Sequence, residues 1–185
     1  MLKIDENLKN ILLETIDKAI EYGLKHQAIL PIKLQDYPTE LQKPGACFVT
    51  LKIHNKLRGC IGTLRAHRPL IKDIIHNSHA AAFKDNRFSP LLDTEFKLMT
   101  KELSILNDLQ EIDFTSEDDL LTKIKPNIDG LLLIEGKYSG TFLPSMWQQL
   151  PEKQDFLANL KAKAGLDDNY WSDTIRIFRY TTKTI

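Results

Sequence analysis

The chain has 185 residues, of which 42% are hydrophobic and 27% are charged, so it is long enough to bury one substantial core in a single domain or two closely associated lobes. Lysine plus arginine and aspartate plus glutamate number 25 each, and this zero net charge excludes a strong long-range field that would attract DNA. No stretch approaches the roughly 20 apolar residues that span a bilayer, and the first residues lack the features of a secretion signal, so we expect a cytoplasmic protein.

The first predicted element is a helix that Asp5 caps, because apolar residues recur after it at three- and four-residue spacing. Residues 29–45 contain three prolines and are expected to form an irregular connection. Residues 47–53 alternate in polarity as a half-buried strand does, and residues 57–64 return beside them after a turn. This pattern predicts a β-hairpin.

The rest of the chain alternates predicted helices with predicted strands. Pro69 suits the first turn of a second helix, which stops near Asp85. A Gly-Lys turn at residues 136–137 joins two further strands into a second hairpin. Together the elements predict an α+β fold with mainly antiparallel sheets and flanking helices. The other predicted elements are a short helix at 93–99, a strand at 102–106, a short helix from Ser116 to Ile124, hairpin strands at 130–135 and 138–143, a helix at 152–164 that ends at Gly165, and a strand at 174–181.

Charge is unevenly distributed along the chain although it sums to zero. Residues 41–72 contain seven lysines and arginines and no acidic residue, whereas residues 102–122 contain seven acidic residues and no basic one. Two interpretations stay open. The two segments lie near one another or are solvated faces, or the first segment forms a local anion site.

Residues 57–62, with the sequence Leu-Arg-Gly-Cys-Ile-Gly, form the candidate working surface and are called the hexapeptide below. If the first hairpin turns its alternate apolar residues to the core, Leu57 and Ile61 are buried there. Arg58 and Cys60 then share the opposite face. This arrangement predicts a cation and a thiol side by side.

Gly59 and Gly62 carry no side chain, so another backbone or a ligand can approach the strand closely there. Arg58 suits a carboxylate or a phosphate through paired hydrogen bonds. Asp85 and Arg87, which follow the second predicted helix, form either a loop salt bridge or a second wall of the same binding site.

Cys60 has two interpretations that the sequence leaves open. It is a small buried residue, or it lines or attacks a ligand, although no histidine lies near enough in sequence to be its obvious base. A disulfide with Cys47 is disfavoured because the alternation puts the two thiols on opposite faces. His76 and His79 lie one helical turn apart without a clear third ligand, and no CxxC, HExxH, Walker or GxGxxG motif occurs. We therefore expect neither a metal site nor a cofactor.

The hexapeptide resembles the hallmark sequence of the AMMECR family, whose prokaryotic members are named AmmeMemoRadiSam system protein A. The resemblance covers residues 45–180 and includes blocks in the family's order. These blocks are Phe48-Val49-Thr50-Leu51, Ala81-Ala82-Phe83-Lys84-Asp85-Asn86-Arg87-Phe88, Gly130-Leu131-Leu132, Tyr138-Ser139-Gly140, Leu143-Pro144, Phe156-Leu157 and Lys163-Ala164-Gly165-Leu166.

The resemblance implies one AMMECR-type domain over residues 1–185, built from two closely associated α+β subdomains with the hexapeptide facing the cleft between them. It implies Memo-like and radical SAM proteins as partners, and it implies no settled activity. The sequence departs from the family pattern at Asn86 and Ser89, where proline is frequent, and at Ser145, where glutamine is frequent. These departures concern the far rim of the expected cleft more than the hexapeptide.

Three functional hypotheses follow. The leading one is a cleft protein whose hexapeptide binds a polar or anionic substrate or partner, with Asp85 and Arg87 opposite it. The second is a non-catalytic adaptor that docks with a Memo-like or radical SAM protein, and the third is nucleic-acid binding through residues 41–72. An enzyme predicts a reactive Cys60 thiolate, an adaptor predicts an inert thiol, and nucleic-acid binding predicts an affinity that falls steeply with salt.

Overall fold

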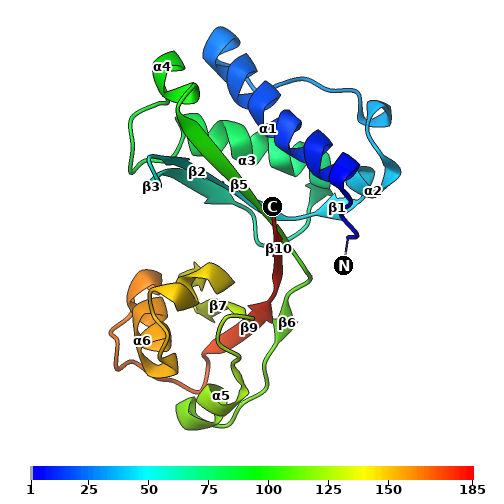
Figure 1. Ribbon diagram of the computed structural model, residues 1–185. Helices are drawn as coiled ribbons and strands as arrows, with labels where there is room; N and C mark the ends of the chain where they lie inside the picture. Colours follow the sequence, from blue (N-terminus) through cyan, green and yellow to red (C-terminus); the bar gives the residue numbers. More distant parts are fainter. Residues whose placement is uncertain (1) are drawn as a thin grey trace. The chain divides into compact units, whose positions relative to one another are not determined.

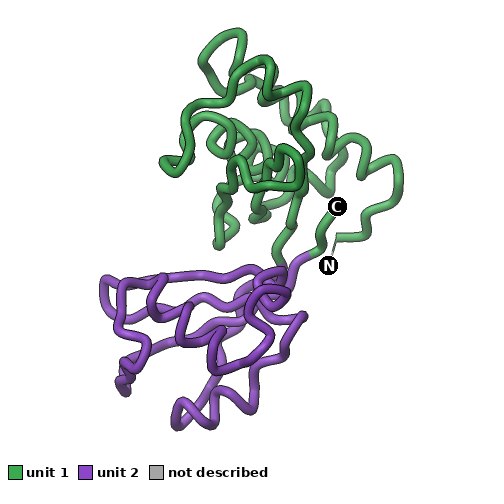
Figure 2. The backbone as a smooth tube through the Cα atoms, turned by 60° about the vertical axis from the view of Figure 1, so that its left-hand side comes forward, with its two compact units in different colours: residues 1–106, 183–185 green, residues 107–182 purple. Residues whose placement is uncertain are grey.

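The structure is a computed structural model that describes residues 2–185, which form two compact units (Figure 2). Unit 1 comprises the described residues up to Leu106 together with Lys183–Ile185, and unit 2 comprises Asn107–Thr182. The chain therefore enters unit 2 after Leu106 and returns to unit 1 at Lys183. Within residues 2–185, no helix has the length and apolar character needed to cross a membrane.

Unit 1 is built on a four-stranded sheet with helices packed against it (Figure 1). Its elements are α1 (Glu6–His26), the 3₁₀ helix η1 (Leu34–Asp36), α2 (Thr39–Gln42), β1 (Pro44–Gly45), β2 (Cys47–Ile53), β3 (Lys56–Gly62), β4 (Arg68–Pro69), α3 (Leu70–Phe83), α4 (Asp93–Phe96), β5 (Met99–Leu106) and β10 (Thr182–Thr184). The strand order is β10-β5-β2-β3, and β2 pairs antiparallel with both β3 and β5. The strand β3 is therefore an edge strand.

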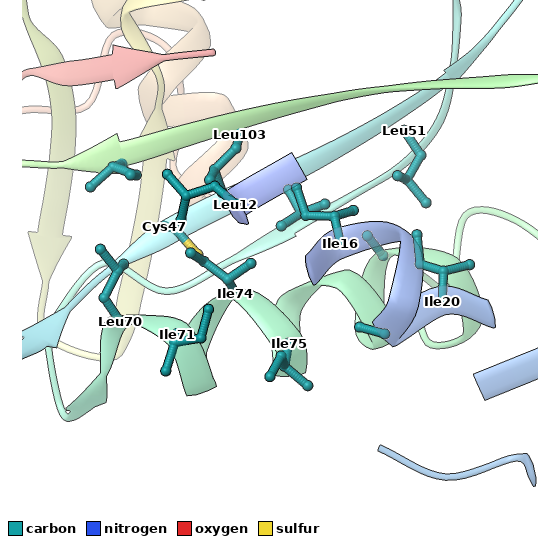
Figure 3. Close-up of a cluster of buried hydrophobic side chains, with 14 of the residues drawn as sticks. Leu12, Ile16, Ile20, Cys47, Leu51, Leu70, Ile71, Ile74, Ile75 and Leu103 are labelled. Carbon is teal, nitrogen blue, oxygen red and sulfur yellow. The ribbon is translucent and has the colours of Figure 1, made fainter. Parts of the chain in front are cut away.

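The core of unit 1 lies between α1, α3 and one face of this sheet. Asp5 caps α1 by accepting a hydrogen bond of 2.8 Å from the backbone N–H of Leu8. The fully buried apolar side chains of both helices pack with those of β2 and β5, and Figure 3 shows part of this cluster. Burying one such side chain contributes roughly 1.5–3 kcal/mol, so this cluster fixes β2 and, through it, β3. The cluster includes Leu12, Ile16, Ile20, Val49, Leu51, Ile71, Ile74 and Leu103.

Side chains on the opposite face of this sheet form rows across β3, β2 and β5. Thr50 of β2 lies directly opposite Cys60 of β3 and Glu102 of β5. Because successive side chains of a strand point to opposite faces, this row points away from the core to which Val49 and Leu51 belong. Cys60 therefore lies on the face of the sheet that the core of unit 1 does not use.

Unit 2 is built on a second antiparallel sheet with the strand order β6-β9-β7-β8. Its elements are β6 (Gln110–Glu111), α5 (Glu117–Lys123), β7 (Gly130–Glu135), β8 (Tyr138–Phe142), the 3₁₀ helix η2 (Pro144–Gln148), α6 (Lys153–Ala164) and β9 (Arg176–Tyr180). Trp147 stacks on Phe156 with ring centroids 3.7 Å apart, and its indole N–H donates a 2.7 Å hydrogen bond to the carbonyl of Asp129. Helix α6 ends at Gly165, whose φ of 86° favours glycine.

The α+β fold with antiparallel sheets expected from the sequence is confirmed. The strand predicted at residues 47–53 coincides with β2, and the second predicted hairpin corresponds to β7 and β8. Two regions differ. Residues 29–45 contain η1, α2 and β1, which are too short to produce a periodic pattern. The strand predicted at residues 174–181 is the shorter β9, and β10 follows it in the other sheet.

Candidate functional site

The hexapeptide lies on β3, where the pairing with β2 is irregular. Gly59 lies opposite Leu51 and Leu57 lies opposite Lys52, so Arg58 has no partner on β2 and forms a β-bulge. An extra residue reverses the alternation of faces beyond it. Leu57 therefore leaves the core face and is 43% exposed, and the prediction of a buried Leu57 is wrong.

Arg58 is bound by a carboxylate from α4. Its Nε and Nη2 donate to the two carboxylate oxygens of Glu95 over 2.8 and 2.9 Å, and Nη2 also donates to the carbonyl of Ser89 over 2.8 Å. These hydrogen bonds raise the pKa of Arg58 and lower the pKa of Glu95. The side chains of Arg58 and Glu95 are 13% and 29% exposed, so Arg58 already holds an anion, supplied by the chain itself.

Asp85 and Arg87 form a salt bridge at the open edge of β3. Arg87 Nε and Nη2 donate to the two carboxylate oxygens of Asp85 over 2.9 and 2.7 Å. Asp85 in turn accepts the backbone N–H of Cys60 over 2.9 Å, and Arg87 Nη2 donates to the carbonyl of Cys60 over 3.2 Å. The hydrogen bonds from Arg87 and from the Cys60 backbone lower the pKa of Asp85 to about 2. The two residues therefore make a salt bridge and also occupy the backbone groups of the hexapeptide's edge.

The ring of Phe88 brings Arg58 and Arg87 into one cluster. The guanidinium carbons of the two arginines lie 5.7 and 5.5 Å from the ring centroid. Each guanidinium is balanced by its own carboxylate. Glu95 is a site residue that could not be predicted from the sequence. Its only local signal is its position three residues after Leu92, whose backbone N–H it accepts over 2.9 Å, and this signal indicates a helix start rather than a site.

The thiol of Cys60 is partly exposed, and its Sγ lies 3.3 Å from the hydroxyl oxygen of Thr50. His54 lies in the turn between β2 and β3, and His67 lies beyond the end of β3. Among residues 2–185, the hydrogen-bonding partner of this thiol is a hydroxyl and not the histidine that a Cys–His nucleophile requires. Catalysis by Cys60 stays a prediction.

The two glycines of the hexapeptide admit atoms of the protein itself. A Cβ on Gly59 would lie 2.1 Å from the backbone oxygen of Ala81 in α3, and a Cβ on Gly62 would lie 2.2 Å from the ring of Phe48. The missing side chain at Gly59 therefore lets α3 pack directly on β3. Of the two uses expected for these glycines, the structure shows the approach of another backbone, and contact with a ligand stays a prediction.

A buried carboxylate fixes the start of β2 and the segment after β3. Asp73 of α3 is fully buried, and its Oδ2 accepts the backbone N–H of Cys47 over 3.1 Å, the side-chain N–H of Asn77 over 3.0 Å and the hydroxyl of Thr63. Arg68 Nε lies 3.0 Å from Asp73 Oδ1. Burial and the neighbouring carboxylate raise the pKa of the Cys47 thiol well above its usual value. This network, also missed from sequence, holds both ends of the hairpin in place.

His76 and His79 do not gain a third ligand. Among the described residues, no group of three or more His, Cys, Asp or Glu side chains is placed to hold a metal ion. The ring of His79 packs against Phe83 with centroids 5.0 Å apart, and burial lowers the pKa of both histidines. The contacts of His79 are those of a packing residue.

Fold and site together define a two-unit α+β protein with a guanidinium–carboxylate cluster at a bulged edge strand. The AMMECR1 family model matches residues 13–185. Protein TK0174 of Thermococcus kodakarensis is 33% identical over 194 residues, and protein PYRAB00100 of Pyrococcus abyssi is 35% identical over 195 residues; each match covers 99% of this chain and 92% of the relative. The crystal structure of uncharacterized protein PH0010 from Pyrococcus horikoshii matches with a TM-score of 0.90 at 32% identity, over 99% of this chain and 93% of that one. The chain therefore belongs to the AMMECR1 family, as the resemblance of its hexapeptide indicated.

Proposed function

We propose that this protein binds a polar or anionic group of a substrate or partner at the cluster of Arg58, Cys60, Asp85 and Arg87. The observation that carries this proposal is that two guanidinium groups lie over one aromatic ring at the edge of a sheet. Arg87 is 51% exposed, and guanidinium groups bind carboxylates and phosphates through paired hydrogen bonds.

The rigidity of the cluster supports the same proposal. The strand β3 is held by β2 on one side, by α3 against Gly59, and by Asp85 and Arg87 at its outer edge. Groups that are fixed in this way bind a ligand without losing much conformational freedom. The arrangement therefore favours recognition by preformed side chains.

Exchanging the charges of the pair Arg58 and Glu95 tests the proposal. The double variant Arg58→Glu/Glu95→Arg retains an ion pair but moves the cation from β3 to α4. We expect each single variant to lower the melting temperature, because like charges then meet, and the double variant to restore it. We also expect the double variant to fail in complementing a deletion strain. Full complementation by the double variant would show that Arg58 has only a structural role, and the proposal would be wrong.

A non-catalytic adaptor is the second candidate function. The observation that favours it is the hydrogen bond between Cys60 and the hydroxyl of Thr50, in place of a catalytic base. In this proposal the cluster contacts a Memo-like or radical SAM protein in the cytoplasm. Co-purification of such a partner with the wild type and with Cys60→Ser, and the alkylation rate of Cys60, separate the two functions. An adaptor predicts that Cys60→Ser still binds the partner and that the thiol reacts slowly.

Nucleic-acid binding is the third candidate, and the ion pairs of unit 1 count against it. Three of the seven basic residues in the segment 41–72 are paired with carboxylates, so fewer of them are free to replace counterions on phosphates. An affinity for nucleic acid that does not change with salt would remove this candidate. The three pairs are Lys52 with Glu102, Arg58 with Glu95, and Arg68 with Asp73.

A further inference from the structure

Three exposed leucines lie next to Arg58 or Glu95 along the chain. Six large apolar side chains among residues 2–185 are exposed, and these three are among them: Leu57 at 43%, Leu92 at 62% and Leu98 at 56%. Leu57 precedes Arg58 on β3. The backbone N–H groups of Leu92 and Leu98 donate to the carboxylate and the carbonyl of Glu95 over 2.9 and 3.0 Å. Several exposed apolar side chains beside polar groups are typical of a surface that another protein covers.

Glu95 is placed so that another carboxylate can replace it. Its side chain is 29% exposed, so it can rotate into solvent, and water then replaces it as the acceptor of the exposed Leu92 N–H. Phe96 still packs on the core of unit 1, and the backbone N–H of Leu91 still bonds the end of α3 over 2.8 Å. Arg58 keeps its hydrogen bond to the carbonyl of Ser89. An incoming carboxylate would leave Arg58 paired and Glu95 hydrated, so the exchange strands no buried charge.

We propose that this surface binds an acidic segment of a partner polypeptide, whose carboxylate takes the place of Glu95 on Arg58 while its apolar side chains contact Leu57, Leu92 and Leu98. This inference rests on the proposed function and names the ligand of that site. The Nε and Nη2 edge of Arg58 binds a planar carboxylate by donating two hydrogen bonds, as its contacts of 2.8 and 2.9 Å with Glu95 show. The three leucines give a polypeptide an advantage that a small free acid lacks.

Glu95 competes with the ligand for Arg58, so the surface selects ligands that offer more than a carboxylate. A ligand that offers only a carboxylate replaces one ion pair by an equivalent one and gains little. A ligand that offers a carboxylate and apolar side chains gains the burial of the leucines as well. Removing the charge of Glu95 should therefore raise the affinity for an acidic peptide, by about fivefold if the internal pair has the strength of a partly exposed ion pair.

Fluorescence anisotropy on the 185-residue chain tests the exchange. The probes are labelled peptides in which one glutamate is followed by leucines at two-, three- or four-residue spacing, and matched peptides with glutamine in place of glutamate. In Glu95→Gln the side chain still accepts the N–H of Leu92, so α4 stays capped. We expect Glu95→Gln to bind an acidic peptide about fivefold more tightly than the wild type. We expect this increase in affinity to disappear in Arg58→Gln/Glu95→Gln. We also expect the glutamine peptides to bind Glu95→Gln no more tightly than the wild type. Leu92→Ser should weaken binding of the acidic peptides.

The inference is overturned if Glu95→Gln binds no acidic peptide more tightly than the wild type, or if the gain persists in Arg58→Gln/Glu95→Gln. Complete competition by free glutarate at the concentration of the peptide would assign the surface to small acids and overturn the polypeptide ligand. These results can be distinguished from a failure of the proposed function. If the charge-exchanged Arg58→Glu/Glu95→Arg protein does not complement while Glu95→Gln gains nothing, the site stands and only the acidic partner is wrong.

Discussion

The substitution Gly59→Ala is expected to destabilise unit 1 because α3 lies directly against β3 at this glycine. A Cβ would lie 2.1 Å from the backbone oxygen of Ala81 and 3.0 Å from its carbonyl carbon. Cβ atoms essentially never come closer than 3.0 Å to another heavy atom, so the strand and the helix would have to separate by about 0.9 Å at this point. The obstructing atom belongs to the backbone of a helix and cannot rotate away as a side chain does.

This separation is costly because α3 is packed on both sides. Ile71 and Ile74 are fully buried between α1 and the sheet, and Ala82, next to the contact, is 2% exposed. Moving the helix would open gaps in a core packed at the density of an organic crystal. Overpacking of a core costs typically 1–3 kcal/mol, and with a backbone atom as the obstacle we expect a loss of about 3 kcal/mol for Gly59→Ala.

Urea denaturation followed by two spectroscopic signals measures this loss and distinguishes unit 1 from unit 2. Both tryptophans of the chain, Trp147 and Trp171, belong to unit 2, so their fluorescence reports on unit 2 while circular dichroism reports on both units. We expect Gly59→Ala to shift the circular-dichroism transition to lower urea. The control is Gly136→Ala, where the Cβ meets nothing within 4 Å and a φ of 54° costs about 1 kcal/mol. If Gly59→Ala unfolds at the urea concentration of the wild type with the same slope, α3 does not constrain β3 in the way described.

Three further predictions concern individual ionisable groups. The pKa of Asp85 is about 2 in the folded chain against about 3.9 in an unfolded one, so the stability that this carboxylate contributes, about 2 kcal/mol, is present above about pH 4 and lost as the pH falls towards 2. Urea midpoints at pH 6 and pH 2.5 should therefore differ less in Asp85→Asn than in the wild type, and an unchanged difference would contradict this assignment. Lys161 is 1% exposed and donates to both carboxylate oxygens of Glu117 over 2.9 and 3.0 Å, so Glu117→Gln, which leaves a buried ammonium unpaired, should cost about 3 kcal/mol. Lys161→Met leaves only the 35% exposed Glu117 and should cost less than about 1 kcal/mol; equal losses in the two variants would be evidence against a buried charge. Iodoacetamide should alkylate Cys60 in the native protein and spare Cys47, whose buried thiol has a raised pKa, and peptide mass spectrometry showing equal labelling would refute this difference.

The elements that the sequence predicted well are those whose signals are local. Asp5 and Ser116 accept backbone N–H groups at the starts of α1 and α5, and Gly165 ends α6 with a positive φ, as their residue types indicated. The hairpin of β7 and β8 follows in the same way from the turn at Gly136. These features involve residues a few positions apart, and chain order alone is sufficient to find them.

The partners within the candidate site could not be predicted, because they lie far apart in the chain. Arg58 and Glu95 are 37 residues apart, and Asp73 and the Cys47 backbone are 26 residues apart. No periodicity links such positions, and a glutamate in a short helix is indistinguishable from a solvated one. The bulge at Arg58 is hidden for a different reason: a single extra residue leaves the composition of the strand unchanged while it reverses the face of Leu57.

The bulge also determines which substitutions in the hexapeptide report on function. Gly59 and Gly62 face atoms of α3 and β2, so replacing the whole hexapeptide would disturb the scaffold together with any site. The side chains of Arg58 and Cys60 are different, since a charge exchange with Glu95 keeps the ion pair and Cys60→Ser keeps a hydrogen bond to Thr50. A protein that retains complementation with both changes would need neither a cation on β3 nor the sulfur of Cys60. The hexapeptide would then act through its glycines, as the surface on which α3 packs.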